Sequence, residues 1–123
     1  MILGIGTDLF DVDRMRRNLQ RDADFAASVF TPAEIDYCRA KRDPAPHFAA
    51  RFAAKEALVK AMADARGEGA FWLDAGVRRR EDGKPVFDLS GRLADLAAGL
   101  EVRGIHLSIT HTDTLAAAVV VLE

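Results

Sequence analysis

The segment from Phe48 to Met62 constrains the fold of this 123-residue chain more than any other. Ala, Leu, Met, Lys, Glu and Arg dominate it and it lacks Gly and Pro, which is the composition of a strong helix. Its apolar residues recur near helical spacing, which predicts one apolar face. The many alanines let other elements approach closely, while Glu56 and three cations project: Arg51, Lys55 and Lys60. We therefore expect a helix that packs tightly and carries a site.

The composition is that of an ordinary globular domain, with half of the residues apolar and 29% charged. We expect one domain over 1–123, with so small a core that oligomerisation would add useful burial. A net charge of −2 argues against a nucleic-acid partner. The single cysteine, Cys38, excludes an intramolecular disulfide and is interpreted as a structural thiol. Because no apolar run approaches a membrane span and the start does not resemble a signal peptide, we expect a cytoplasmic protein without a membrane partner.

The first half is expected to hold one strand followed by helices. Gly4 and Gly6 leave one face of the strand open to close packing, and Asp8 is expected just after its end. Thr31 as N-cap, with Pro at the first helical position and Glu34 at the third, predicts a helix start with a capping box. The expected elements are a strand over 1–6, helices over 11–20 (capped by Asp11), 24–29 and 31–40, and a loop over 41–46.

The second half is expected to be rich in strands. The long helix should end near Ala65, since Gly67 and Gly69 follow. The expected elements are a strand over 71–80, a turn over 81–84, a strand over 85–89, a helix over 90–100 capped by Ser90, a strand over 105–109, a polar turn over 110–113, and a buried strand over 115–122. This order predicts the α+β class, with a mostly antiparallel sheet packed against the long helix.

Two carboxylates are candidates for a metal site: Asp8 and Glu56. Mg²⁺ prefers oxygen ligands, keeps several waters and completes its shell with substrate phosphates, so two carboxylates would suffice. The sequence alone does not bring them together. An ion pair between Glu56 and Lys60, one helical turn apart, is equally compatible and would contribute only about 0.3 kcal/mol.

Five cations are candidates for binding a pyrophosphate beside that metal. Arg51, Lys60 and Lys55 lie on the long helix, and Lys41 and Arg42 lie in the loop before it. Arginine in particular suits phosphate, because its planar fork of donors matches two phosphate oxygens. Cations spread over a helix are, however, more often simply solvated.

The polar turn expected near residue 110 carries small hydroxyls and a histidine. Ser108, Thr110 and His111 could donate hydrogen bonds to phosphate oxygens. A nucleophilic role for Ser108 with His111 is disfavoured, because the G-x-S-x-G elbow is absent.

Four arginines crowd the first helix: Arg14, Arg16, Arg17 and Arg21. Such a group is commonly a solvated face. In a chain of negative net charge it also suggests an acidic partner.

Taken together, five motifs resemble those of the holo-acyl-carrier-protein synthases, the small trimeric class of 4′-phosphopantetheinyl transferases. They occur in the family's order and spacing and span nearly the whole chain, and R-F-A-A-K-E-A with the following Lys60 is the most specific. The motifs are Gly4-Ile5-Gly6-Thr7-Asp8, Phe30-Thr31-Pro32-Ala33-Glu34, Arg51-Phe52-Ala53-Ala54-Lys55-Glu56-Ala57, Gly83-Lys84-Pro85 and Ser108-Ile109-Thr110-His111-Thr112.

The resemblance implies transfer of 4′-phosphopantetheine from coenzyme A to a serine of apo-acyl carrier protein, with release of adenosine 3′,5′-bisphosphate. It implies a homotrimer with sites between protomers, and Mg²⁺ as the metal, with Mn²⁺ as an alternative. Asp8 and Glu56 would hold the metal and Lys60 would neutralise a phosphate oxygen. Either Glu56 or a metal-bound water would accept the proton of the carrier's serine.

The resemblance also assigns the substrate contacts. Arg14, Arg17 and Arg21 would face an acidic helix of the carrier, which is a fatty-acid or a polyketide carrier. After Met62 this chain departs from the family's Gly-Thr-Gly-like loop, with A-D-A-R-G-E-G over 63–69. The residues expected to bind coenzyme A are Arg51, Lys60, Ser108, Thr110 and His111 at its phosphates, Lys41 and Arg42 in the loop, and Gly83, Lys84 and Pro85 bordering the adenine.

Two other functions stay open at this point. One is a non-catalytic binder of acidic helical proteins, which would need only the arginine face. The other is a different Mg²⁺-dependent coenzyme A or nucleotide enzyme, such as a coenzyme A pyrophosphatase. Intact Asp8 and Glu56 argue against the first of these.

Overall fold

The computed structural model describes residues 1–62 and 71–123, and it confirms the predicted α+β class. The helix end expected near Ala65 and the loop over 63–69 lie outside the described residues. The elements are β1 (Gly4–Asp11), α1 (Val12–Arg21), α2 (Phe25–Val29), α3 (Pro32–Arg39), α4 (Pro44–Ala61), a 3₁₀ helix η2 (Trp72–Asp74), β2 (Ala75–Arg79), β3 (Pro85–Leu89), α5 (Gly91–Gly99), β4 (Ile105–His111) and β5 (Leu115–Leu122).

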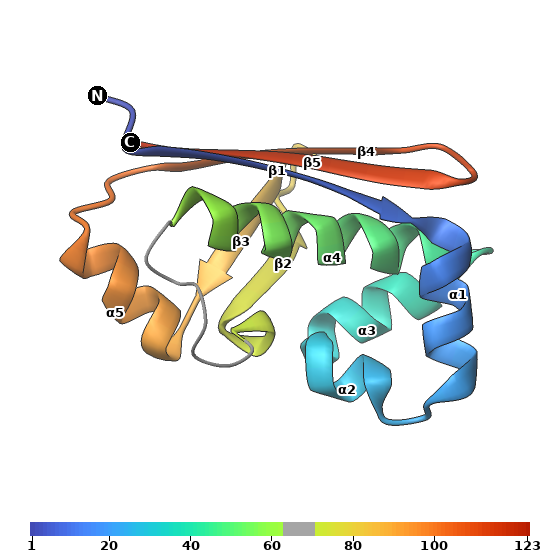
Figure 1. Cartoon of the computed structure of the whole chain (residues 1–123). Helices are drawn as coiled ribbons and strands as arrows, with labels where there is room; N and C mark the ends of the chain where they lie inside the picture. Colours follow the sequence, from blue (N-terminus) through green and yellow to red (C-terminus); the bar gives the residue numbers. More distant parts are fainter. Residues whose placement is uncertain (63–70) are drawn as a thin grey trace.

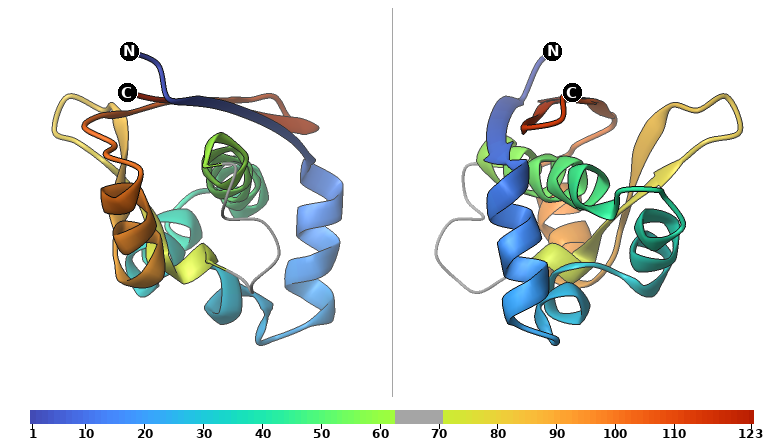
Figure 2. Two further views of the ribbon diagram at one scale, coloured as in Figure 1. Left: turned by 60° about the vertical axis from the view of Figure 1, so that its left-hand side comes forward. Right: turned by 90° about the vertical axis from the view of Figure 1, so that its right-hand side faces the viewer.

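Helix α4 lies at the centre of the molecule, against one face of an antiparallel sheet of order β1-β5-β4 (Figure 1). Helices α1, α2 and α3 lie below one end of α4, and the β2-β3 hairpin and α5 lie toward the other. The outer face of the sheet carries no further described element (Figure 1). In Figure 2 the β2-β3 hairpin projects from the body of the molecule, so its tip is accessible.

The two glycines of β1 allow the strand to touch the backbone of α4, as the sequence predicted. A Cβ atom on Gly6 would overlap the carbonyl oxygen of Ala57, and one on Gly4 would overlap that of Ala61. Ala57 and Ala61 are themselves buried. Small residues on both elements therefore set the spacing between sheet and helix, and with it the position of every side chain that leaves α4 beside β1.

The predicted helix starts are confirmed at two places. The side chain of Asp11 accepts from the backbone N–H of Arg14 at 2.9 Å. Thr31 and Glu34 form the reciprocal capping box of α3. At α5, Ser90 occupies the N-cap position, but its side chain makes no capping hydrogen bond.

Four predicted boundaries are wrong. Asp8 lies in the middle of β1, because the strand pairs with β5 along its whole length, as far as Asp11 opposite Leu115. Helix α4 begins at Pro44, within the expected loop, since proline is tolerated in the first turn of a helix. Residues 72–74 form a 3₁₀ turn before β2. Strand β4 continues through His111, which shortens the polar turn.

None of the described helices is long and apolar enough to span a membrane.

Candidate active site

The first group of predicted site residues gathers where β1 meets α4. The ammonium of Lys60 lies 3.0 Å from Oδ1 of Asp8 and also donates to the Thr7 carbonyl oxygen at 3.0 Å. Glu56 precedes Lys60 by one turn and so leaves α4 on the same side. Among the described residues it forms no ion pair with Lys60; instead its Oε1 accepts from the indole Nε1 of Trp72 at 2.8 Å. We call Asp8, Glu56 and Lys60 the carboxylate group.

The donor chemistry of the carboxylate group fits Mg²⁺. Within the described residues, no cluster of three or more His, Cys, Asp or Glu side chains could enclose a metal by itself. Two carboxylates on adjacent elements leave positions for water and phosphate, and Mg²⁺ sites that serve phosphate substrates have that composition. Asp8 and Glu56 are therefore the side chains that would hold such an ion.

A second group surrounds the ring of Tyr37. The guanidinium of Arg51 lies 3.9 Å from the ring centroid, and the Lys41 ammonium lies 4.6 Å from it. The phenol oxygen accepts from Nε of Arg79 at 3.0 Å. Arg51 is only 1% exposed, and its buried Nε has no hydrogen-bond partner among the described residues. Because buried donors are nearly always satisfied, this free donor fits an anion that enters the group.

Two histidines complete this second group. The rings of His47 and His111 lie 5.1 Å apart, and His47 lies 6.2 Å from Tyr37. Burial lowers the pKa of His47, and the nearby His111, Lys41 and Arg51 lower it further. The cations gathered around His47 create a positive potential, which attracts a multiply charged anion such as a phosphate. The basic group consists of Lys41, His47, Arg51, Arg79 and His111 around Tyr37.

Arg79 ties the tip of the β2-β3 hairpin to the basic group. Its Nη1 donates to the carbonyl oxygen of Gly83 at 2.7 Å while its Nε holds Tyr37. Gly83 has a φ of +86°, a conformation that favours glycine. The predicted turn of Gly83, Lys84 and Pro85 therefore lies beside the predicted phosphate ligands. Arg79 and Tyr37 were not predicted as site residues, because no local motif marks either and only tertiary contact joins them.

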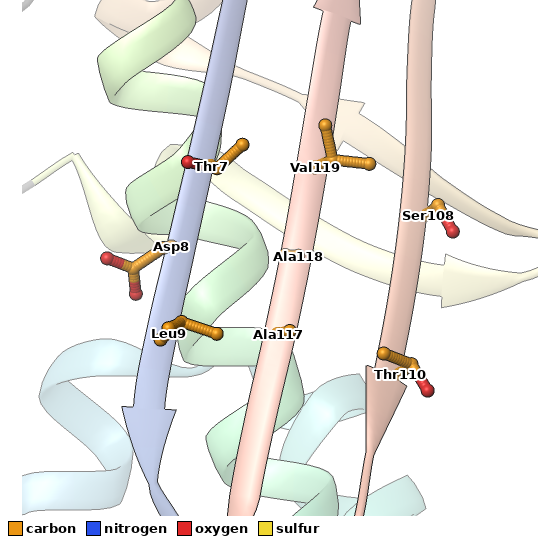
Figure 3. Close-up of a pocket in the computed structure, with 8 residues that line it drawn as sticks. All are labelled: Thr7, Asp8, Leu9, Ser108, Thr110, Ala117, Ala118 and Val119. Carbon is orange, nitrogen blue, oxygen red and sulfur yellow. The ribbon is translucent and has the colours of Figure 1, made fainter.

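The carboxylate and basic groups lie on opposite faces of α4. Arg51 and Lys60 are nine residues apart, which corresponds to about 180° around the helix and about 13 Å along it. Figure 3 shows that Asp8, Ser108 and Thr110 line one pocket of the sheet, Asp8 from β1 and the two hydroxyls from β4, on the other side of β5. Within a single chain, the structure thus brings Asp8 to one pocket with Ser108 and Thr110, whereas Arg51 and Lys60 leave α4 on opposite faces.

The alternation of β4 also divides its polar motif. Leu107 and Ile109 face α4, and His111, two residues further on, shares that side and meets His47. Ser108 and Thr110 are exposed and belong to the outer face of the sheet. The three predicted phosphate contacts of this motif are therefore split between two faces. Arg42, beside Lys41, is exposed.

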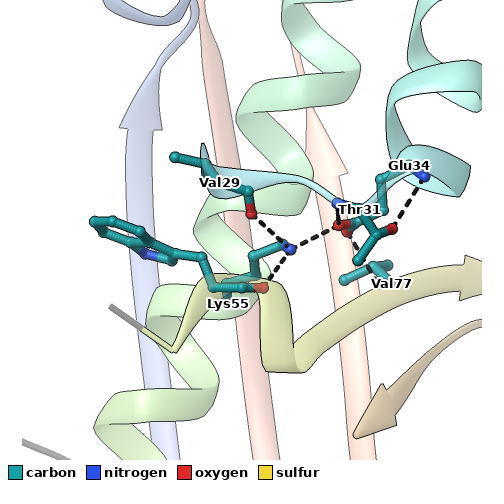
Figure 4. A network of polar contacts seen from close by, with 6 residues as sticks. Val29, Thr31, Glu34, Lys55 and Val77 are labelled. Atoms are coloured by element: carbon teal, nitrogen blue, oxygen red, sulfur yellow. Dashed lines mark hydrogen bonds and ion pairs between the residues drawn. The ribbon is translucent and has the colours of Figure 1, made fainter. Parts of the chain in front are cut away.

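Lys55 does not belong to either group, so its expected role at a pyrophosphate is wrong. It is 1% exposed and pairs with Glu34, itself 1% exposed, at 2.6 Å (Figure 4). Its ammonium also donates to the carbonyl oxygens of Val29 and Trp72, at 3.0 and 2.7 Å. Glu34 in turn accepts from the backbone N–H of Val77 at 2.9 Å. Removing one partner of such a buried pair typically costs about 3–5 kcal/mol, so Lys55 has a structural role.

The arginines of α1 separate into two kinds. Arg16 forms a bidentate ion pair with Asp43, at 2.8 and 3.0 Å. Arg14, Arg17 and Arg21 are exposed and, at spacings of three and four residues, share one face of the helix. The exposed face is the one that a partner could contact.

The class of protein follows from comparison with known families. The family model of the 4′-phosphopantetheinyl transferase superfamily matches residues 4–120. Holo-[acyl-carrier-protein] synthases are among the relatives. The enzyme of Koribacter versatilis is 44% identical, and the match covers all of this chain and 99% of the relative. The enzyme of Anaeromyxobacter dehalogenans is 47% identical, and the match covers all of this chain and 97% of the relative. The chain therefore belongs to the holo-[acyl-carrier-protein] synthases within this superfamily.

Solved structures agree with this assignment. The holo-[acyl-carrier-protein] synthase of Neisseria meningitidis superimposes with a TM-score of 0.86 at 31% identity, covering all of this chain and 99% of that one. That of Helicobacter pylori, solved in complex with coenzyme A, has a TM-score of 0.83 at 28% identity and covers 97% of this chain and 99% of its own.

Proposed function

We propose that this protein transfers 4′-phosphopantetheine from coenzyme A to a serine of apo-acyl carrier protein and releases adenosine 3′,5′-bisphosphate. The observation that carries the proposal is the pairing of a carboxylate group with a separate basic group. Coenzyme A has two separate anionic parts, a pyrophosphate and a 3′-phosphate. The two groups match these parts: a metal bound by carboxylates suits the pyrophosphate, and the basic group suits the 3′-phosphate.

Asp8 and Glu56 would hold Mg²⁺, or Mn²⁺ in its place, against the pyrophosphate. When bound, the metal supplies positive charge that stabilises the oxygens of the phosphoryl group in transfer. Lys60 leaves α4 beside both carboxylates and neutralises a further phosphate oxygen. Asp8, Glu56 and Lys60 are thus the catalytic residues, and the proton of the carrier's serine passes to Glu56 or to water.

The basic group would hold the nucleotide end of coenzyme A. Arg51 and Lys41 lie against the Tyr37 ring and His111 lies beside His47, and these three side chains would contact the 3′-phosphate. The hairpin tip at 83–85, held by Arg79, borders the adenine. Arg42, Ser108 and Thr110 add contacts from the neighbouring turn and from the outer face of the sheet.

Two copies of the chain are needed to complete one site, because α4 separates the two groups. The outer face of the sheet is the surface through which copies would associate. Ile5, Leu9, Leu115 and Val119 are exposed there, at 59, 66, 42 and 37%. Burial of a row of apolar side chains on a sheet face is a typical driving force for association. The homotrimer of the family, with one site at each interface, satisfies both requirements.

The carrier would dock on α1. Arg14, Arg17 and Arg21 present three positive charges on one exposed helix face, which complements an acidic helix. We place the reaction in the cytoplasm, where acyl carrier proteins and coenzyme A are both available.

The deciding experiment incubates the protein with coenzyme A, Mg²⁺ and apo-acyl carrier protein and measures the intact mass of the carrier. A gain of one phosphopantetheine on the carrier supports the proposal, and Glu56→Gln should abolish it while leaving the fold intact. Cleavage of coenzyme A without a gain in mass would indicate a pyrophosphatase instead. Carrier binding without either reaction would indicate a non-catalytic binder.

A further inference from the structure

Trp72, the only tryptophan of the chain, contacts a catalytic residue without having a role in the proposed chemistry. Its indole Nε1 donates a hydrogen bond of 2.8 Å to Oε1 of Glu56. An indole N–H can only donate, and an ionised carboxylate can only accept, so the direction of this bond is unambiguous. Oε2 of Glu56 makes no hydrogen bond within the described part of the chain. Toward the described residues, one oxygen of the carboxylate is therefore occupied and the other is open.

The position of Trp72 is fixed from two sides. Its carbonyl oxygen accepts from the buried ammonium of Lys55 at 2.7 Å, and that ammonium is locked by its ion pair with Glu34. Its ring packs on Phe52, with centroids 5.9 Å apart. Lys55 and Glu56 are consecutive, so their side chains leave α4 about 100° apart. Lys55 donates to the main-chain carbonyl of Trp72, and Glu56 accepts from its indole N–H.

We infer that Trp72 is a positioning residue that orients the Glu56 carboxylate and directs Oε2 toward the metal. The inference depends on the proposed role of Glu56 as a metal ligand. A carboxylate with one oxygen engaged by an indole binds a cation through a single oxygen. This mode suits Mg²⁺ and Mn²⁺ in near-octahedral sites, whereas Ca²⁺ commonly takes bidentate carboxylates. Removal of a hydrogen-bond partner of a metal ligand typically weakens metal binding 10- to 100-fold.

Trp72→Phe tests the inference because it keeps an aromatic ring against Phe52 and removes only the donor. Mn²⁺ binding is measured by electron paramagnetic resonance in the presence of coenzyme A. We expect the dissociation constant to rise about tenfold or more, a matching rise in the Mn²⁺ concentration needed for half-maximal turnover, and an unchanged melting temperature. Leu73→Ala, an exposed neighbour on η2, is the matched control and should bind Mn²⁺ as the wild type does. Wild-type Mn²⁺ affinity in Trp72→Phe would overturn the inference.

A second measurement uses the wild-type protein and does not depend on the folding of a variant. Since Trp72 is the only tryptophan and touches Glu56, Mn²⁺ added with coenzyme A should quench its emission. An unchanged emission would overturn the inference.

Glu56→Gln separates the two proposals. If Glu56→Gln binds Mn²⁺ like the wild type, the proposed metal site itself is wrong. If Glu56→Gln loses Mn²⁺ binding while Trp72→Phe retains it, only the role given to Trp72 is wrong.

Discussion

Lys60 forms an ion pair with Asp8 across the junction of α4 and β1, with 3.0 Å between Nζ and Oδ1. The Asp8 side chain is 14% exposed and that of Lys60 is 49% exposed, so the lysine can turn away while the carboxylate stays in place. Asp8 is also a proposed ligand of the metal. An ammonium and a divalent cation therefore compete for one carboxylate, and metal binding would release Lys60 toward a phosphate oxygen.

We predict that Lys60→Met binds Mn²⁺ several-fold more tightly than the wild type in the absence of coenzyme A, although its turnover falls sharply. The reason is that the variant removes the competing cation at 3.0 Å from the ligand oxygen. Electron paramagnetic resonance titration of free Mn²⁺ measures the change. Arg39→Met, which removes an exposed cation of α3, is the control. Equal or weaker Mn²⁺ binding in Lys60→Met would show that the pair does not oppose the metal.

The separation of Arg51 from Glu56 and Lys60 on α4 predicts complementation between inactive variants. Arg51→Ala lacks the basic group and Glu56→Gln lacks the carboxylate group, so neither should transfer phosphopantetheine alone. In mixed oligomers, some interfaces combine the carboxylate group of an Arg51→Ala subunit with the basic group of a Glu56→Gln subunit. The site at such an interface is intact. Random mixing makes about one quarter of the interfaces intact.

The experiment unfolds the two variants together, refolds them, and compares turnover with that of each variant refolded alone. Recovery of roughly a quarter of wild-type turnover is expected under random subunit exchange. Turnover that remains at the level of the separate variants, although the mixed oligomers form, would place both groups in one chain.

Local rules predicted the elements well because the relevant residues are neighbours in the sequence. The capping box of Thr31 and Glu34 needs only a spacing of three residues, and the close packing of Gly6 follows from the absence of a side chain. Glu34, however, also receives Lys55 and the N–H of Val77, contacts that span 21 and 43 residues. No local pattern distinguishes a lysine that reaches a buried carboxylate from one that reaches solvent.

The candidate site was predicted residue by residue through family resemblance, but its arrangement was not. Helical periodicity places Arg51 and Lys60 on opposite faces of α4 whatever their surroundings, and strand alternation separates His111 from Ser108. Trp72 and Arg79 depend on the path of the chain between helix and hairpin. Their contacts with Glu56 and Tyr37 therefore became visible only in three dimensions.

The position of His47 in the basic group predicts how its contribution to stability depends on pH. Burial and the surrounding cations lower the pKa of its imidazole below the ordinary value of about 6.5. Protonation is therefore less favourable in the folded than in the unfolded chain, and the contribution of His47 to stability is lost as the pH falls through its folded-state pKa. A bound anion offsets the positive potential, so adenosine 3′,5′-bisphosphate should raise this pKa.

Titration of the imidazole resonances by nuclear magnetic resonance measures the pKa of His47, and His47→Gln assigns its signal among the three histidines. We expect a value below 6.5 in the free protein and an upward shift with the nucleotide. Arg79→Ala should raise the pKa in the free protein, because it removes one of the cations that lower it. A nucleotide that binds without moving the His47 signal would place its phosphates elsewhere.

The contact between β1 and α4 predicts unequal effects of two glycine substitutions. In Gly6→Ala, the new methyl group would overlap the Ala57 carbonyl oxygen, which belongs to the helix backbone and cannot turn aside. Overpacking of this kind costs about 1–3 kcal/mol, and displacement of α4 would also move Glu56 and Lys60. Gly76→Ala is the matched control, because its methyl group would lie 3.5 Å from Cγ2 of Thr31, an ordinary contact.

Urea unfolding followed by circular dichroism compares the two variants. We expect Gly6→Ala to lose about 1–3 kcal/mol of the free energy of unfolding, and Gly76→Ala to lose less than about 1 kcal/mol. Mn²⁺ binding should weaken only in Gly6→Ala, because Asp8 lies two residues further along the same strand face. Equal losses in both variants would mean that the spacing between β1 and α4 is not set by the glycine.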